Sequence, residues 1–190
     1  QHGGQSIVNF DYGMAPGVQK TFVKRYRANL ARALELLGNV EDAADVAARI
    51  LDELEQETGK KPSLAADPDY DRALIEKIAQ AMPAASQEVD TRVLDFVREH
   101  AEKETDKATY QAMEALIHNL NTMNSRAGAQ VPFSSINYGM DTSPEGRMVM
   151  RNVLLATEAG LGNGETPIFP IQIFRVKEGV SFNPGDPNYD

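Results

Sequence analysis

Apolar residues change their spacing about two-thirds of the way along this chain. Before residue 124 they recur in steps of three and four, whereas afterwards two short runs rich in β-branched and aromatic residues flank one more helical run. Steps of three and four place apolar side chains on one face of a helix, and short runs bounded by turn residues are typical of strands. The chain is therefore expected to be an α/β protein, mainly helical up to residue 123 and strand–helix–strand over 124–190.

The first helical run has the most regular spacing. Its stripe consists of Val23, Tyr26, Leu30, Leu34 and Leu37. Pro16 suits the first turn of a helix and Gly38 suits its end, which predicts a helix over 16–37. Residues 1–13 contain one short apolar run between glycines and are expected to form a loop or a short edge strand.

Three further helices are expected before residue 124. The second covers about 40–57, and the third begins at Asp67 and ends before Pro83, because proline disfavours helix at the residue that precedes it. The fourth covers 86–123 and contains a polar middle, AEKETDKA. That middle leaves two alternatives open, one long helix or two nearly collinear helices.

The last third of the chain is expected to alternate between strand and helix. Residues 130–138 and 167–176 have the composition of strands. Between them, Thr142 or Ser143 suits the cap of a helix whose first turn contains proline and glutamate and which Gly160 ends. Two strands alone leave open edges, so the sheet is expected to continue outside these residues.

Composition argues against several classes of function. The formal net charge of -9 argues against general nucleic-acid binding, and no apolar run approaches the length of a membrane span. The chain has no cysteine, which excludes disulfides, thiolate metal sites and cysteine nucleophiles within it and fits a cytoplasmic protein. It begins at Gln1 without an initiator methionine and ends in a turn-rich stretch, so we interpret it as an internal part of a longer protein.

The first helix reverses the acidic character of the chain. Between Tyr12 and Leu34 there are five basic residues and no acidic ones. Lys20, Lys24 and Arg27 recur at helical spacing and so share one face. Such a face is usually a solvated surface, and this is the simpler interpretation. The alternative is a phosphate site, because clustered ammonium and guanidinium groups offset the charge of a triphosphate.

A second polar feature is the stretch NSRAGAQVPFSSINYG. Arg126 and Gln130 lie among small residues, which indicates either a flexible surface loop or a loop that reshapes around a ligand. The expected strand after it carries Ser134, Ser135 and Asn137 where Val or Ile would be usual. These side chains indicate either the polarity of an edge strand or contact with hydroxyl or phosphate oxygens of a ligand.

Three long stretches of the chain resemble the anaerobic (class III) ribonucleoside-triphosphate reductases. They are GGQSIVNFDYGMAPGVQKTF, HNLNTMNSRAGAQVPFSSINYG and TSPEGRMVMRNVLLATEAGLGNGETPIFPIQIFRVKEG. The resemblance covers the beginning and the last third densely, while about 40–110 is less distinctive. It implies an oxygen-independent enzyme that converts ribonucleoside triphosphates to deoxyribonucleoside triphosphates. It also implies a fold in which a helical bundle leads into part of a ten-stranded glycyl-radical-enzyme α/β barrel.

The resemblance assigns domains and site residues. Residues 1–123 become a helical effector-binding and dimerisation region, and 124–190 become the first part of the catalytic barrel. The effector, a deoxynucleoside triphosphate or ATP, is expected to contact Asp11, Lys20 and Lys24. A specificity loop between effector and substrate is expected to consist of Asn124, Ser125, Arg126, Gly128 and Gln130. The ribonucleoside triphosphate substrate is expected to contact Ser134 and Ser135.

The resemblance also implies cofactors and partners outside these residues. The family's thiyl-forming cysteine, cysteine-ligated zinc site and glycyl-radical loop are missing, so no catalytic residue, cofactor or metal is expected within this chain. The full-length protein is expected to use a glycyl radical installed by a radical-SAM activating enzyme, and a structural zinc. We expect a homodimer that uses an apolar face left over on the helices of residues 16–120.

Two other functions stay open at this point. The chain could belong to another glycyl-radical enzyme, such as a formate-lyase-like acyltransferase, or it could be a non-catalytic helical dimerisation module. Only the reductase predicts binding of deoxynucleoside triphosphates that depends on the base. None of the three functions is expected to involve binding to a membrane or to nucleic acid.

Overall fold

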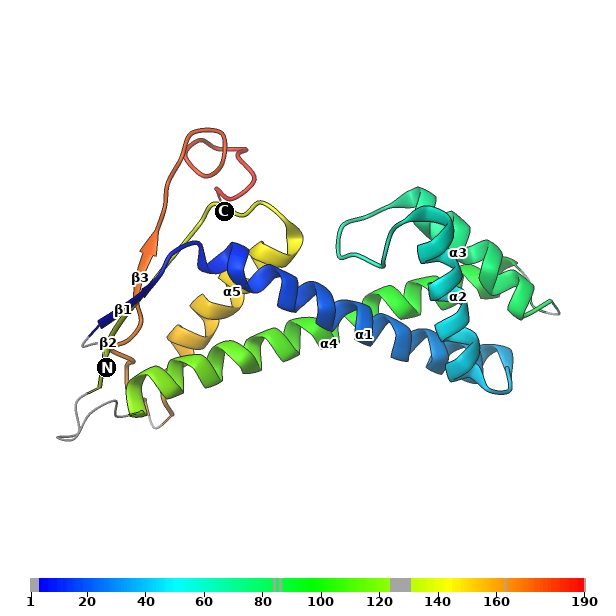
Figure 1. The fold of residues 1–190 in the computed structure, drawn as a ribbon, viewed down its shortest axis with the longest axis horizontal. Coiled ribbons are helices and arrows are strands. Elements are labelled where there is room, and N and C mark those ends of the chain that lie inside the picture. The colour runs from blue at the N-terminus through cyan, green and yellow to red at the C-terminus, as the bar shows by residue number, and fades with distance from the viewer. Residues whose placement is uncertain (1–3, 84, 86, 124–130, 163, 190) are drawn as a thin grey trace. The chain divides into compact units, whose positions relative to one another are not determined.

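The computed structural model describes residues 4–83, 85, 87–123, 131–162 and 164–189. Its elements are β1 (Gly4–Ile7), α1 (Phe10–Gly38), α2 (Ala43–Thr58), α3 (Pro68–Ala81), α4 (Gln87–Thr122), β2 (Phe133–Tyr138), α5 (Pro144–Ala159) and β3 (Ile171–Phe174) (Figure 1). They form two compact units, a sheet unit of residues 1–18 and 106–190 and a helical unit of residues 19–105. Both α1 and α4 contribute residues to each unit.

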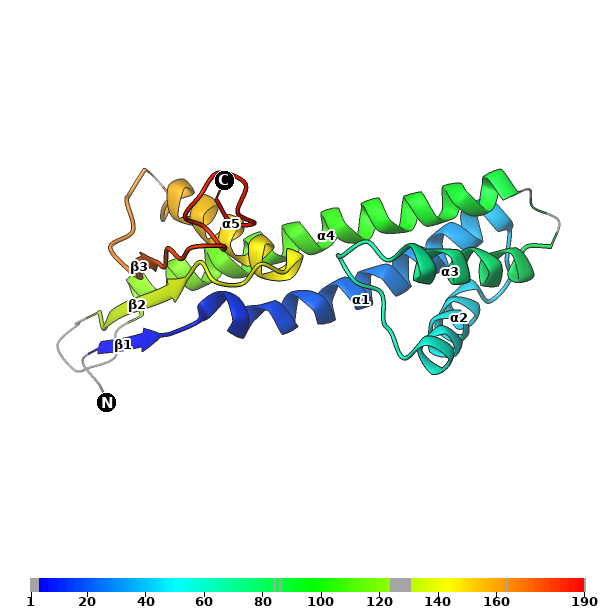
Figure 2. The ribbon, with the colours of Figure 1, turned by 90° about the horizontal axis from the view of Figure 1, so that it is seen from above.

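The sheet unit is built on a parallel sheet in the order β1–β2–β3 (Figure 2). Ile7 pairs with Ile136 on one side of the central strand, and Ser135 pairs with Ile171 on the other. Helix α5 connects β2 to β3, which is the usual connection between neighbouring parallel strands. The segment expected to be a loop or an edge strand is therefore an edge strand, and the strand–helix–strand prediction is confirmed.

Local sequence explains where α5 begins and ends. Ser143 is the N-cap, and its hydroxyl accepts a hydrogen bond from the backbone N–H of Gly146 at 3.1 Å. Pro144 occupies the first turn, where its missing N–H costs nothing. At the other end Gly160 has a φ of 79°, which glycine adopts without strain, and the helix stops there. The buried side of α5 includes Val149 and Val153.

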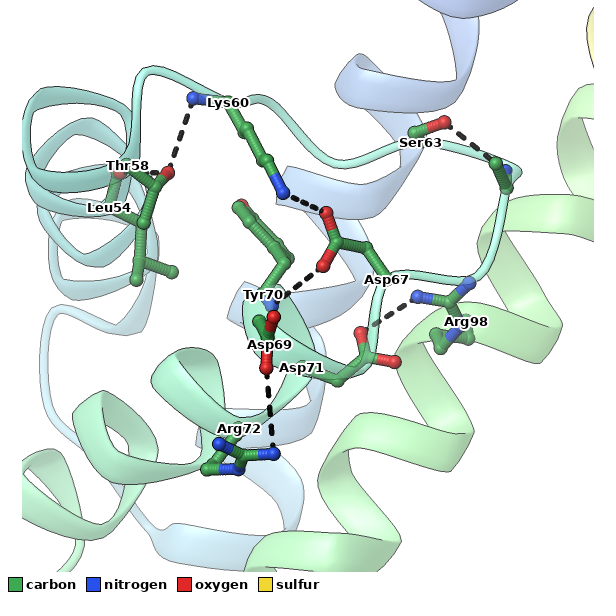
Figure 3. A network of polar contacts seen from close by, with 11 residues as sticks. Leu54, Thr58, Lys60, Ser63, Asp67, Asp69, Tyr70, Asp71, Arg72 and Arg98 are labelled. Atoms are coloured by element: carbon green, nitrogen blue, oxygen red, sulfur yellow. Dashed lines mark hydrogen bonds and ion pairs between the residues drawn. The ribbon is translucent and has the colours of Figure 1, made fainter.

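The helical unit has one apolar core. Buried side chains from all four helices contribute to it, including Tyr26, Leu30, Leu34, Ile50, Leu54, Leu74, Ile78, Val93 and Val97. Asp67 caps α3 by accepting from the backbone N–H of Tyr70 at 3.1 Å, and its other oxygen accepts from Lys60 (Figure 3). Asp71 of α3 pairs with Arg98 of α4 at 2.8 Å. The predicted start of the third helix is thus confirmed.

Two helix boundaries are informative. Helix α1 begins at Phe10, so the predicted start at Pro16 is wrong, and that proline lies inside the helix. Pro16 removes one backbone donor but does not end the helix. Phe10 before the proline and Val18 after it are both buried, and their packing stabilises the helix on either side of Pro16. Helix α4 runs unbroken from Gln87 to Thr122, which decides between the two alternatives in favour of one long helix.

The exposed apolar surface does not lie where it was expected. Within the described part of residues 16–120, Leu36 and Leu37 are the large apolar side chains that lie exposed, although Leu37 belongs to the apolar stripe of the first helix. The other helical stripes are buried against one another, so an apolar face left over on these helices is not found there. Exposed apolar side chains instead gather in the sheet unit, at Ile7, Val8, Phe133, Ile168, Ile171, Ile173, Phe174 and Val176. Among the described residues, no helix is both long and apolar enough to cross a membrane.

Candidate functional site

The carboxyl ends of the parallel strands define the candidate site. In open α/β sheets, ligands bind beside these ends because connecting loops and helix starts converge there. Here the carboxyl end of β1 leads into α1, and the carboxyl end of β2 leads through residues 139–143 into α5. The polar residues that the sequence singled out on β2 point toward the two faces of this sheet.

The face of the sheet away from α5 carries hydroxyl and amide groups on β1 and β2, beside the exposed side chains of Ile171 and Ile173 on β3. Strand alternation and the strand register place Ser6, Ser135 and Asn137 on this face. The Ser135 hydroxyl donates to the Ser6 hydroxyl at 3.0 Å. The side-chain oxygen of Asn137 is buried and has no hydrogen-bond partner among the described residues. We refer to these three residues as the open-face polar group.

Ser134 lies on the opposite face. It alternates with Ser135 along β2, and it is 8% exposed. The same face carries Tyr138, whose hydroxyl donates to Gln172 at 2.6 Å, and Gln172 in turn donates to Thr157 of α5 at 2.6 Å. Burial raises the pKa of Tyr138, so its hydroxyl stays protonated as the donor. Ser134 and Ser135 therefore face opposite sides of the sheet, and the predicted contact of both with a substrate stays a prediction.

Asp11 has a different environment from the one predicted. Its side chain is fully buried, and one carboxylate oxygen accepts from the backbone N–H groups of Gly139, Met140 and Asp141, each at 2.9 Å. The other oxygen accepts from the N–H of Tyr12 at 3.0 Å. A carboxylate with four backbone donors has no exposed oxygen left for a ribose hydroxyl. In this conformation the Asp11 carboxylate is therefore not accessible to an effector.

Lys20 and Lys24 lie on an exposed face of α1 in the helical unit. Neither forms an ion pair with a described carboxylate, whereas Arg27 on the same face pairs with Asp52 at 3.1 Å. Two exposed ammonium groups without an ion-pair partner among the described residues are available to an anionic ligand. Asp11 belongs to the sheet unit, whereas Lys20 and Lys24 belong to the helical unit.

The predicted specificity loop, Asn124, Ser125, Arg126, Gly128 and Gln130, lies outside the described residues. The residues that flank it both contact the segment before β3. Asn121 of α4 donates to the carbonyl of Phe169 at 2.6 Å, and its oxygen accepts from the N–H groups of Ile168 and Phe169 at 2.9 and 3.0 Å. On the other side, the ring of Phe133 meets the ring of Phe169 edge-on, with centroids 5.1 Å apart.

Sequence reasoning missed Asn121 and Asn188. Asn188 donates to the carbonyl oxygens of Gly139 and Asp141, at 3.2 and 2.9 Å. An asparagine near a helix end or in a turn-rich segment is common, so neither position carries a signal that points to a distant backbone partner. Among the described residues, no group of three or more histidine, aspartate or glutamate side chains is placed to hold a metal ion.

The fold and the candidate site together define a class of protein. The sheet unit is an α/β module whose parallel strands present polar side chains on an open face, which is typical of proteins that bind small polar ligands. A family model described as "Anaerobic ribonucleoside-triphosphate reductase" matches residues 1–190. The chain therefore belongs to that family, as the resemblance of its three long stretches implied.

Individual relatives agree with the family. The anaerobic ribonucleoside-triphosphate reductase of Salmonella typhimurium is 37% identical over 92 residues, which is 48% of this chain and 13% of that protein. The enzyme of the same name from Haemophilus influenzae is 36% identical over 95 residues, or 50% of this chain and 13% of the relative. The one from Enterobacteria phage T4 is 40% identical over 92 residues, or 48% and 15%. The matched stretch is thus a small part of each relative's length.

Proposed function

We propose that the full-length protein reduces ribonucleoside triphosphates to deoxyribonucleoside triphosphates without oxygen. In this proposal, residues 1–190 carry the specificity site for an effector and part of the substrate pocket. The observation that carries the proposal is the family match along the whole chain, supported by relatives named for this activity. The radical chemistry and the cysteine-ligated zinc are assigned to residues of the full-length protein outside this stretch, which has no cysteine, and the activating enzyme is a separate partner.

The proposed effector contact is the exposed face of α1 that carries Lys20 and Lys24. Its support is chemical, because two exposed ammonium groups one helical turn apart, neither in an ion pair with a described carboxylate, can together offset the charge of a polyphosphate. The proposed partner of this contact is the loop with Arg126 and Gln130, which would carry the identity of the effector to the substrate. A homodimer is part of the proposal, with the effector bound between its subunits.

The proposed substrate contact is the open-face polar group. Ser6 and Ser135 supply hydroxyls that can donate to or accept from ribose and phosphate oxygens. The buried oxygen of Asn137 lacks a described partner, which is costly unless a ligand, water or further protein segment supplies one. Ser134 is buried on the other face, and its hydroxyl oxygen also lacks a described partner, so it is a separate candidate for contact with a ligand, a water or a further protein segment.

Equilibrium binding tests the proposal directly. The full-length protein is titrated anaerobically with each deoxynucleoside triphosphate and with ATP, and ribonucleotide reduction is then assayed with each effector present. We expect affinities that differ with the base and a preferred substrate that changes with the effector. Binding that ignores the base, together with acyl transfer from a small acid, would favour the formate-lyase-like alternative. Dimerisation without any nucleotide binding would favour the structural module.

A further inference from the structure

The three residues after β2, which we call the 139–141 loop, have an unusual set of hydrogen bonds. All three backbone N–H groups donate to Asp11, as described above. The first and third carbonyl oxygens accept from Asn188, and the middle one accepts from the Tyr12 hydroxyl at 3.0 Å. Every backbone donor and acceptor of this loop is therefore bound by a side chain that lies far away in the sequence.

These hydrogen bonds pair all polar backbone groups of the loop, and together with the surrounding backbone they also restrict its conformation. Gly139 has a φ of 116°, and a Cβ atom there would lie 2.8 Å from the carbonyl oxygen of Arg175. The Arg175 N–H donates to the carbonyl of Tyr138 at 2.8 Å, and its guanidinium donates to Asn9 at 3.0 Å. Segments from the start, the middle and the end of the chain thus meet at the carboxyl end of β2.

The carboxylate of Asp11 contributes most to the stability of this arrangement. A buried ionised carboxylate is very unfavourable unless several donors replace the water it has lost. Hydrogen bonds to a charged acceptor are about twice as strong as neutral ones, so the three N–H groups and the charge stabilise each other. The loop therefore has one strongly preferred conformation, and Asp11 determines it.

The position of the loop links it to the proposed substrate contact. It directly follows Asn137 and Tyr138 of β2, and Asp141 accepts from the N–H of Ser143, the cap of α5, at 2.9 Å. We propose that Asp11 is a positioning residue for substrate binding: by fixing the 139–141 loop, it sets the place of the open-face polar group and of the start of α5. This inference rests on the proposed function, and it gives Asp11 a role unrelated to the effector.

The test uses the full-length protein with the substitutions Asp11→Asn and Asp106→Asn. Asp106 is a matched control, because it is an acid of the sheet unit that pairs with Arg151 and Asn152 and has no bond to the 139–141 loop. In Asp11→Asn we expect amide exchange of the loop to accelerate about tenfold or more, because the three bonds to the loop lose their charge assistance and the new NH2 group cannot accept from the Tyr12 N–H. We also expect kcat/KM for the substrate to fall about tenfold. The Kd of the effector should stay within about twofold, and Asp106→Asn should change none of the three.

A second variant tests the same inference in case the Asp11→Asn protein does not fold. Asn188→Ala removes two hydrogen bonds to loop carbonyls and keeps the carboxylate, so it should shift exchange and kcat/KM in the same direction by a smaller factor. Faster loop exchange with unchanged kcat/KM in either variant would show that the loop has only a structural role. A large rise in the effector Kd with unchanged exchange would return Asp11 to the effector site. Both results overturn the inference, whereas a wild-type protein that neither binds nor reduces a ribonucleoside triphosphate contradicts the proposed function itself.

Discussion

Replacing Gly146 by alanine tests the packing around the 139–141 loop with a change of one methyl group. Gly146 lies in the first turn of α5, where alanine is intrinsically the better residue by about 1 kcal/mol. Helix propensity alone therefore predicts a more stable protein. The structure predicts the opposite, because the added Cβ would lie 2.6 Å from the Cβ of Asp141 and even closer to its carboxylate.

The magnitude follows from what Asp141 can do in response. Its side chain is 5% exposed, and one of its oxygens accepts from the N–H of Ser143, so it cannot turn away freely. Overpacking of a buried site costs about 1–3 kcal/mol. Loss of the Ser143 bond adds about 1 kcal/mol. After subtracting the propensity gain, we expect Gly146→Ala to lower the free energy of unfolding by about 1–3 kcal/mol.

The assay is urea denaturation of the 190-residue chain followed by far-UV circular dichroism. Gly13→Ala is the matched control, because Gly13 also lies near the start of a helix in the sheet unit and a Cβ there would meet no atom within 4 Å. This control should be neutral or more stable by up to about 1 kcal/mol. The reasoning is refuted if both substitutions stabilise the chain equally, since Asp141 would then not restrict Gly146.

Three further predictions concern charge and coupling. Lys20→Ala and Lys24→Ala should each weaken binding of the effector triphosphate by about 1 kcal/mol, because both side chains are exposed. Binding of the matching nucleoside should stay unchanged. Equal weakening of triphosphate and nucleoside binding in calorimetry would contradict the phosphate contact. Arg126→Ala should reduce the factor by which an effector changes substrate affinity, a coupling free energy of typically about 1–3 kcal/mol, and unchanged factors would make the loop a plain connector. Two hydrogen bonds lower the pKa of Asp67 below 3.8, first the one from Lys60 and then the one from the Tyr70 N–H that Asp67 caps. The ionised Asp67 side chain therefore stabilises the folded protein above that pH, and this contribution is lost as the pH falls through the folded-state pKa. Asp67→Asn should therefore flatten the acid-side loss of stability in denaturation series, and an unaltered acid slope would contradict this.

Features set by neighbouring residues could be predicted from the sequence. Asp67 before Pro68 and Ser143 before Pro144 each cap a helix with contacts only three residues apart. Such contacts need no knowledge of the rest of the fold. The helices that begin there were accordingly predicted within a few residues.

Features set by distant residues could not be predicted in the same way. Three of the four backbone donors to Asp11 come from residues 128 to 130 positions later in the chain. An aspartate in a basic, glycine-containing segment gives no sign of that, so a ligand contact was the natural interpretation. Pro16 illustrates a different limit, because tertiary packing of α1 outweighs the local preference of proline for a helix start.

Ser134 and Ser135 show a third limit. Their hydroxyls are chemically identical, and composition alone gives both the same role. Strand geometry separates them, because successive side chains point to opposite faces of a sheet. The separation could have been predicted from the strand assignment, but the choice of which serine is open depends on the face that α5 covers.

Pairing of β1 with β2 has a consequence for the order of events during synthesis. The hydroxyls of Ser6 and Ser135 that meet in the sheet are 129 residues apart, and the whole helical unit lies between them in the chain. Strand β1 therefore leaves the ribosome early and has to wait, unpaired, until β2 has been made. An unpaired strand is prone to non-native pairing with other strands. Strand β1 is only four residues long, and its sequence GQSI offers little apolar surface for such pairing. We read its brevity and polarity as protection during that delay.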